Sequence, residues 1–170
     1  MQVHTERLPQ VDPTNVERAM RAMFGLNSYQ THSGLEPSLL ELVAIRASQI
    51  NGCAYCLDMH TKDARARGES EQRLYLLDAW CENPFYSERE RAALAWTEAV
   101  TVVADSRVPD TVYVEVRRHF SDDELLALTM AVVTINAFTR LNVALRTVPG
   151  TYQPGIFDRV ARNVTLAAAK

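Results

Sequence analysis

A pair of cysteines in the first half of the sequence offers the clearest chemistry. Cys53 and Cys56 lie in the stretch NGCAYCLDMHTKDA, and His60 follows the second cysteine after three intervening residues. If a helix begins near Cys53, all three side chains share one face of it. The amides of a helix start favour a thiolate, and a histidine one turn away can take a proton from a thiol. This spacing predicts a reactive thiol pair that can close a disulfide.

Metal binding is the main chemical alternative for this cluster. A structural zinc site uses four ligands, usually from two separated pairs. Only three candidates cluster here, and the two further ones, Cys81 and His32, have no second-pair spacing. Haem attachment needs a histidine directly after the second cysteine, where the sequence has leucine. We therefore expect neither a metal nor another cofactor.

Three other residues have interpretations that follow from their positions in the expected helices. Glu41 precedes Cys53 by twelve positions and can face the thiols if two helices meet at the Asn-Gly break between them. Its alternative is an acid in the first turn of a helix, stabilised by the helix dipole. Tyr55 is expected to pack beside the site. Cys81, on an apolar helix end, is expected to be a small core residue.

The overall composition indicates a soluble single domain. The chain of 170 residues is long enough for one core, and its net charge of −3 predicts no affinity for nucleic acid or membranes. The first seven residues lack signal-peptide features, and the longest uncharged run, 125–139, is too short for a bilayer span. We expect a cytoplasmic protein. In the cytoplasm a cysteine pair is more often catalytic or metal-binding than a structural disulfide.

Helical periodicity runs through nearly the whole sequence. Helices are expected over 13 to about 25, 37–51, 53–68, 70–81, 87–103, 109–120, 121–146 and 157–168. The patterns Ser87-x-x-Glu90 and Ser121-x-x-Glu124 are capping boxes that mark two helix starts. No strand pattern and no internal repeat stands out. We predict an all-α, single-domain bundle of six to eight helices spanning 1–170. The helix over 125–145 is apolar on several faces, so it is either central or covered by another subunit.

The chemical residues also match a known family pattern. Glu41, the cysteine pair and His60, with the flanking ELVA, NGC and MHTKDA segments, resemble the active-site signature of the alkylhydroperoxidase D-like family of the carboxymuconolactone decarboxylase superfamily. The resemblance is sharp over 41–68 and looser over about 15–105. It implies an all-helical fold that assembles as homo-oligomers, trimers or hexamers, and a peroxidase that uses cysteines without haem or metal.

The resemblance also implies a role for each site residue. By position, Cys56 would attack a hydroperoxide substrate, and Cys53 would resolve the sulfenic acid into a disulfide. Glu41 and His60 would form the proton relay. A dithiol reductant, of lipoyl type in the best-known branch, would reduce the disulfide. Tyr55 stands where the better-characterised enzymes have histidine, which suits the peroxidase-related branch.

Three functions remain open from the sequence. The first is a thiol-dependent hydroperoxide reductase. The second is a dithiol–disulfide redox sensor or partner protein without efficient peroxidase turnover. The third is carboxymuconolactone decarboxylase-like activity, in a branch that generally lacks the cysteine pair. Because thiol–disulfide exchange needs an accessible sulfur, we expect one sulfur at the base of a narrow cleft.

Overall fold

The chain folds as an all-α single domain. The structure is a computed structural model that describes residues 7–8 and 10–156. Its helices are α1 (Pro13–Thr31), α2 (Pro37–Asn51), α3 (Ala54–Ala66), α4 (Glu71–Leu76), the 3-10 helix η1 (Leu77–Glu82), α5 (Glu88–Thr101), α6 (Val103–Ser106), α7 (Asp110–Val116) and α8 (Asp122–Leu145). The predicted bundle of six to eight α-helices is confirmed for the described part, which has eight. The helix expected over 157–168 lies outside the described residues.

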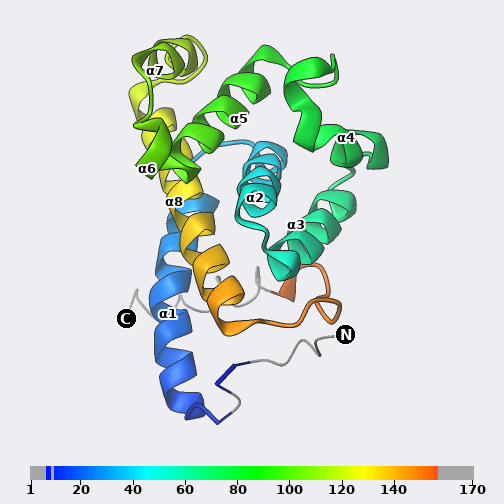
Figure 1. The fold of residues 1–170 in the computed structure, drawn as a ribbon, viewed down its shortest axis with the longest axis vertical. Helices are drawn as coiled ribbons and strands as arrows, with labels where there is room; N and C mark the ends of the chain where they lie inside the picture. Colours follow the sequence, from blue (N-terminus) through cyan, green and yellow to red (C-terminus); the bar gives the residue numbers. More distant parts are fainter. Residues whose placement is uncertain (1–6, 9, 157–170) are drawn as a thin grey trace.

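Helix α2 lies at the centre of the bundle and contacts α3, α5 and α8 (Figure 1). One core cluster joins it to α5, α7 and α8 through residues such as Val43, Trp96 and Val132. A second cluster, with Leu42 and Leu94, joins it to α4, η1 and α5. The remaining face of α2 is left for α3, which carries the cysteine pair. Burial of α2 on several sides therefore fixes the platform on which the candidate site is built.

The α2–α3 corner is formed by a glycine in a left-handed conformation. Gly52 has a φ of 64°, which a residue with a side chain adopts only at a cost. It ends α2, and the next amide, that of Cys53, donates to the carbonyl of Ser48 at 3.0 Å. The chain then turns at once into α3. This tight corner brings the start of α3 against the end of α2.

Helix α8 is the other central element. The expected capping box at its start is present, with Ser121 and Glu124 each bonding the other's backbone amide, and the box at Ser87 and Glu90 is also present. By length and composition alone α8 could cross a membrane. In the fold it packs against α1, α2, α3 and α5 (Figure 1). Helix α8 is therefore central in the fold, which was one of the two alternatives, and its cover by another subunit stays a prediction.

The observed helix boundaries correct several predictions. Helix α1 does not end near Gly25 but continues to Thr31, because Phe24 packs against Phe138 of α8 and tertiary contact outweighs the glycine. The helix expected over 70–81 changes to a 3-10 helix after Leu76. The helix expected over 87–103 ends at 101, and the one expected over 109–120 spans only 110–116.

Cys81 is exposed, so its prediction as a core residue is wrong. The reason is the break in the helix that carries it, where Ala79 has a non-helical backbone. The indole of the neighbouring Trp80 donates to Glu98 at 2.7 Å and turns inward instead. The change of helix geometry thus leaves Cys81 exposed, while Trp80 is partly buried against the second core cluster.

Candidate active site

The two cysteines at the start of α3 form a disulfide. Their Cα atoms are 5.3 Å apart, within the range that a disulfide spans without backbone movement. Cys53 is the N-cap residue of α3, and its sulfur accepts a hydrogen bond from the amide of Cys56 at 3.3 Å. The prediction that a helix start would hold both sulfurs on one face is confirmed.

Both sulfurs lie in an apolar part of the core. The exposed fractions are 1% for Cys53 and 0% for Cys56. Ala44, Ala47 and Ile135 are buried around the pair, and Tyr55 packs against this cluster. The expectation of one sulfur at the base of a narrow cleft is therefore wrong for the disulfide form, because α2 and α8 close over the start of α3.

His60 and Glu41 meet between α3 and α2. Nδ1 of His60 lies 2.8 Å from Oε2 of Glu41, and both side chains are largely buried. The other carboxylate oxygen of Glu41 lies 3.4 Å from Nε of Arg67. When Nδ1 carries the proton it donates to Glu41, which leaves Nε2 free to exchange a proton elsewhere. A carboxylate-held imidazole of this kind can act as a general acid or base.

Asp63 is an acidic neighbour of this pair that the sequence did not single out. Its Oδ2 accepts a hydrogen bond from the hydroxyl of Tyr152 at 2.7 Å. Burial raises the pKa of Asp63, and the charge of Glu41 raises it further, although Tyr152 and His60 act in the opposite direction. Asp63 follows His60 by three positions on α3, which is the local signal that could have identified it.

The segment after α8 binds the outer face of α3. The amide of Gly150 donates to Asp58 at 3.0 Å, and Lys62 donates to the carbonyls of Gly150 and Tyr152 at 3.3 and 3.2 Å. Lys62 also pairs with Asp58, and this hydrogen bond is the main reason that the pKa of Asp58 is lowered. These contacts hold α3 between α2 on one side and the 147–153 segment on the other.

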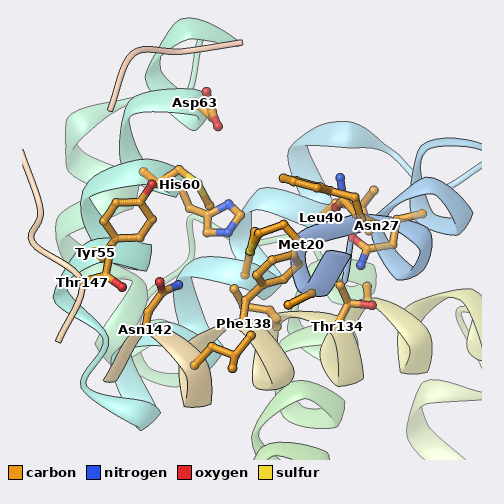
Figure 2. A pocket seen from close by; sticks show the side chains of 18 of the residues that line it. Met20, Asn27, Leu40, Tyr55, His60, Asp63, Thr134, Phe138, Asn142 and Thr147 are labelled. Carbon is orange, nitrogen blue, oxygen red and sulfur yellow. The ribbon is translucent and has the colours of Figure 1, made fainter. Parts of the chain in front are cut away.

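A pocket of about 1100 Å³ lies beside the His60–Glu41 pair. It lies among α1, α2, α3 and α8, and most of its wall is apolar, including Met20, Leu40 and Phe138. Figure 2 shows His60, Tyr55 and Asn142 at one end of it and Asn27 toward the other. A volume of this order fits an organic molecule rather than a few waters. Tyr55 also has a raised pKa, mainly because of burial, so its hydroxyl stays protonated.

Asn142 connects this pocket to the disulfide. Its side-chain Nδ2 donates to the sulfur of Cys56 at 3.4 Å, and the same residue lines the pocket. The two residues are 86 positions apart, and no motif in the sequence links them. Asn142 could therefore be found only from the fold.

No group of three or more His, Cys, Asp or Glu side chains placed to hold a metal ion occurs within 7–8 and 10–156. The structure brings Cys53 to Cys56, as their spacing suggested, and Glu41 to His60, as the family resemblance implied. Asn142 is the residue that donates a side-chain hydrogen bond to Cys56. The arrangement thus combines a disulfide-bonded pair of cysteines, a carboxylate-held imidazole and an apolar pocket.

Known proteins share this sequence and fold. Residues 15–99 match the carboxymuconolactone decarboxylase family. The uncharacterized protein YdfG of Bacillus subtilis is 43% identical over 126 residues, which cover 74% of this chain and 86% of YdfG. A crystal structure from Agrobacterium tumefaciens, of a protein of unknown function described as a candidate antioxidant defence protein AhpD, is 39% identical with a TM-score of 0.81. The match covers 87% of this chain and all of that one.

A more distant structure agrees in fold alone. An uncharacterized peroxidase-related protein from Silicibacter has a TM-score of 0.69 at 23% identity, over 80% of this chain and 72% of that one. Residues 15–99, which match the family, include the cysteine pair, His60 and Glu41. The chain therefore belongs to the carboxymuconolactone decarboxylase family, and its structural neighbours include AhpD-like and peroxidase-related proteins.

Proposed function

We propose that this protein is a thiol-dependent hydroperoxide reductase that cycles between a Cys53–Cys56 dithiol and disulfide. One arrangement carries the proposal: the disulfide lies at the start of α3, and the same helix carries His60, which pairs with Glu41 of α2 beside a pocket of about 1100 Å³. A thiol pair, a proton relay and room for an organic substrate are the three parts that such a reaction needs.

In the proposed first step, His60 takes the proton of the Cys56 thiol and the thiolate attacks the terminal oxygen of the hydroperoxide. A sulfur–oxygen bond forms and the oxygen–oxygen bond breaks. The leaving alkoxide takes the proton back from the His60 imidazolium and departs as an alcohol. Glu41 accepts the hydrogen bond of Nδ1 and stabilises the positive charge on the ring. Cys56 is left as a sulfenic acid.

In the second step, the Cys53 sulfur attacks the sulfenic acid of Cys56. The disulfide forms, and the sulfenic oxygen leaves as water with the proton of the Cys53 thiol. An external dithiol then exchanges with the disulfide, becomes oxidised itself and returns both cysteines to thiols. We propose a lipoyl-type dithiol for this role, in a cytoplasmic setting where thiols are kept reduced.

The shape of the pocket supports an organic hydroperoxide as substrate. Its apolar wall suits an alkyl or aryl group, and His60 stands at the end where the peroxide oxygens would react. Hydrogen peroxide would leave most of the apolar surface in contact with water, so the pocket would add little to its binding.

A second function is supported by the burial of the sulfurs. Because neither sulfur is exposed in the disulfide form, a reductant reaches the pair only after local opening of the surrounding helices. A redox sensor or partner protein that exchanges slowly between the dithiol and the disulfide form fits this restriction. Such a protein would form the disulfide readily but turn over few peroxide molecules per minute in the presence of a dithiol.

The two functions are separated by counting thiols and then measuring turnover. The reduced protein is treated with one equivalent of an organic hydroperoxide, and its free thiols are counted and mapped. The reductase and the sensor both predict loss of the Cys53 and Cys56 thiols, with Cys81 retained. Only the reductase then consumes excess hydroperoxide steadily with a dihydrolipoyl reductant. Survival of all three thiols would contradict both functions.

We also propose that the protein works as a homo-oligomer, a trimer or a hexamer. Helix α8 is central, yet it exposes Leu126, Val133 and Val143 with 56%, 43% and 48% of their surface accessible. A helix that is apolar on several faces is commonly buried on all of them, and a second subunit would cover the face that the fold leaves open. Light scattering coupled to size-exclusion chromatography tests this proposal, and a monomer at micromolar concentration would contradict it.

A further inference from the structure

Cys56 lacks the polar surroundings that usually sustain a thiolate. Its side chain is fully buried among Ala44, Ala47 and Ile135, and burial in apolar surroundings disfavours the charged form of a thiol. The helix start supplies a backbone donor, but the Cys56 amide points to the sulfur of Cys53. That donor therefore serves the other cysteine, and a reactive Cys56 needs a donor from elsewhere.

The structure supplies such a donor from the last turn of α8. Asn142 places Nδ2 3.4 Å from the sulfur of Cys56, within hydrogen-bonding range for sulfur. The helix end holds Asn142 in place, because its carbonyl accepts the amides of Arg146 and Thr147. Figure 2 shows Asn142 beside Tyr55 at the end of the pocket where His60 also lies. Among the described residues, Asn142 thus stands between the pocket and the reacting sulfur.

We propose that Asn142 is a catalytic residue whose side-chain N–H stabilises the thiolate of Cys56. This inference rests on the proposed function in that it takes Cys56 as the reacting sulfur. A carboxamide suits the task because it is uncharged and donates at any pH. Its hydrogen bond is stronger to a charged thiolate than to a neutral disulfide sulfur. Asn142 therefore favours both the reactive form of Cys56 and the reduced state of the pair.

The same geometry predicts an effect on the redox equilibrium. Removing the donor destabilises the thiolate more than the disulfide, so the pair becomes harder to reduce. A hydrogen bond to a charged group typically changes such an equilibrium about tenfold. Asn142 would then influence the step with peroxide and the step with the dithiol through one contact.

The first test isolates the Cys56 thiol. A Cys53→Ser, Cys81→Ser double variant leaves it as the single thiol, since the sequence has three cysteines. Alkylation by iodoacetamide is followed against pH with and without Asn142→Leu, which removes the donor and keeps the side-chain size. We expect about tenfold less thiolate at neutral pH with leucine. Asn142→Asp, with a like charge beside the sulfur, should reduce the thiolate further.

A matched control separates the loss of the hydrogen-bond donor from a general loss of packing. Asn27 lines the same pocket from α1, and Figure 2 shows it away from Asn142. Asn27→Leu should leave the alkylation profile of Cys56 unchanged. Equal profiles for Asn142→Leu, Asn142→Asp and Asn27→Leu, in proteins with cooperative melting, would overturn the proposal.

The second test uses the protein with all its cysteines. Its disulfide is equilibrated with a reference dithiol, and Asn142→Leu should shift the equilibrium about tenfold toward the disulfide. Neither measurement uses peroxide. If both shifts appear and the protein consumes no hydroperoxide, the proposed function fails and the role of Asn142 in thiol chemistry stands. If hydroperoxide is consumed and neither shift appears, only the role of Asn142 fails.

Discussion

Nδ1 of His60 and Oε2 of Glu41 lie 2.8 Å apart, although the two residues are separated by 19 positions and lie on different helices. The contact depends on the corner at Gly52, which turns α3 back along α2. It is therefore a product of the fold rather than of a single helix. The same corner places Cys53 at the N-cap of α3, so one turn positions both the thiols and the proton relay.

Removing either member of this pair should slow hydroperoxide consumption. We expect Glu41→Gln and His60→Gln each to lower the rate about 100-fold, the usual contribution of a general acid or base. Steady-state consumption of an organic hydroperoxide with a dithiol reductant measures this. The two losses should not add in the double variant, because both residues act in one relay.

A second histidine–carboxylate pair provides the control for this prediction. Nε2 of His119 lies 3.3 Å from Oε1 of Glu115. Glu115 is in α7 and His119 follows that helix, on the far side of the bundle from α3. His119→Gln should leave the rate unchanged. A His60→Gln variant that turns over as fast as His119→Gln would remove the relay from the mechanism.

Replacing either of two glycines with alanine should change the free energy of unfolding, in opposite directions at the two positions. Gly52 has a φ of 64°, and a left-handed conformation costs a residue with a side chain about 1–2 kcal/mol. Gly25 lies inside α1, and an added Cβ meets nothing within 4 Å there. We expect Gly52→Ala to lower the free energy of unfolding by about 1 kcal/mol and Gly25→Ala to raise it by about 0.5–1 kcal/mol.

Chemical denaturation measures both changes, and the rate of disulfide formation separates their consequences at the site. Gly52→Ala shifts the start of α3 and should also slow disulfide formation between Cys53 and Cys56. Gly25→Ala should leave that step unchanged. Equal stability of the two variants would mean that the corner tolerates a side chain and does not depend on glycine.

Local sequence signals predicted the parts of this fold that depend on local chemistry. The two capping boxes mark the starts of α5 and α8 because their hydrogen bonds join residues only three positions apart. The cysteine pair was predictable for the same reason, since Cys53 and Cys56 lie within one turn of helix. Short-range geometry of this kind changes little with the rest of the fold.

Features that depend on distant parts of the chain were missed. Helix α1 extends past Gly25 because α8 supports it, and Cys81 is exposed because a change of helix geometry turns Trp80 inward. Asn142 reaches Cys56 across 86 positions. No local pattern records such contacts, because they are fixed only when helices pack together.

Narrowing the pocket should change substrate preference rather than the thiol chemistry. Ala19 is an exposed residue of α1 that lines the pocket, so tryptophan there would occupy part of its volume. We expect Ala19→Trp to lower the rate with a bulky aryl hydroperoxide at least several-fold, because the apolar contact area is lost. The rate with hydrogen peroxide, which needs little space, should remain within about twofold.

Ala22→Trp is the matched control, since Ala22 is exposed on the same helix and does not line the pocket. It should affect neither substrate. If Ala19→Trp lowers both rates equally, the pocket does not select the substrate and the hydroperoxide reaches Cys56 by another route.

The stability of the protein should depend on Asp63 and Asp58 with opposite signs as the pH changes. The pKa of Asp63 is raised above its usual value near 3.9, mainly by burial. As the pH rises through the window between the unfolded and folded pKa values, the folded state holds the proton longer and stability is lost. The pKa of Asp58 is lowered, mainly by the hydrogen bond from Lys62, so its contribution is present above the unfolded pKa and lost as the pH falls.

Two asparagine variants measured by thermal unfolding from acid to neutral pH test these signs. Asp63→Asn keeps an acceptor for Tyr152 and cannot ionise, so its melting temperature relative to the wild type should rise as the pH increases from about 4. Asp58→Asn should lose stability relative to the wild type at more acidic values, as the pH rises toward about 4, because it forgoes the charged partner of Lys62. Parallel pH profiles for the two variants would show that burial does not disfavour the Asp63 carboxylate. Asp63 would then carry its negative charge beside His60 over the whole pH range in which the reaction is measured.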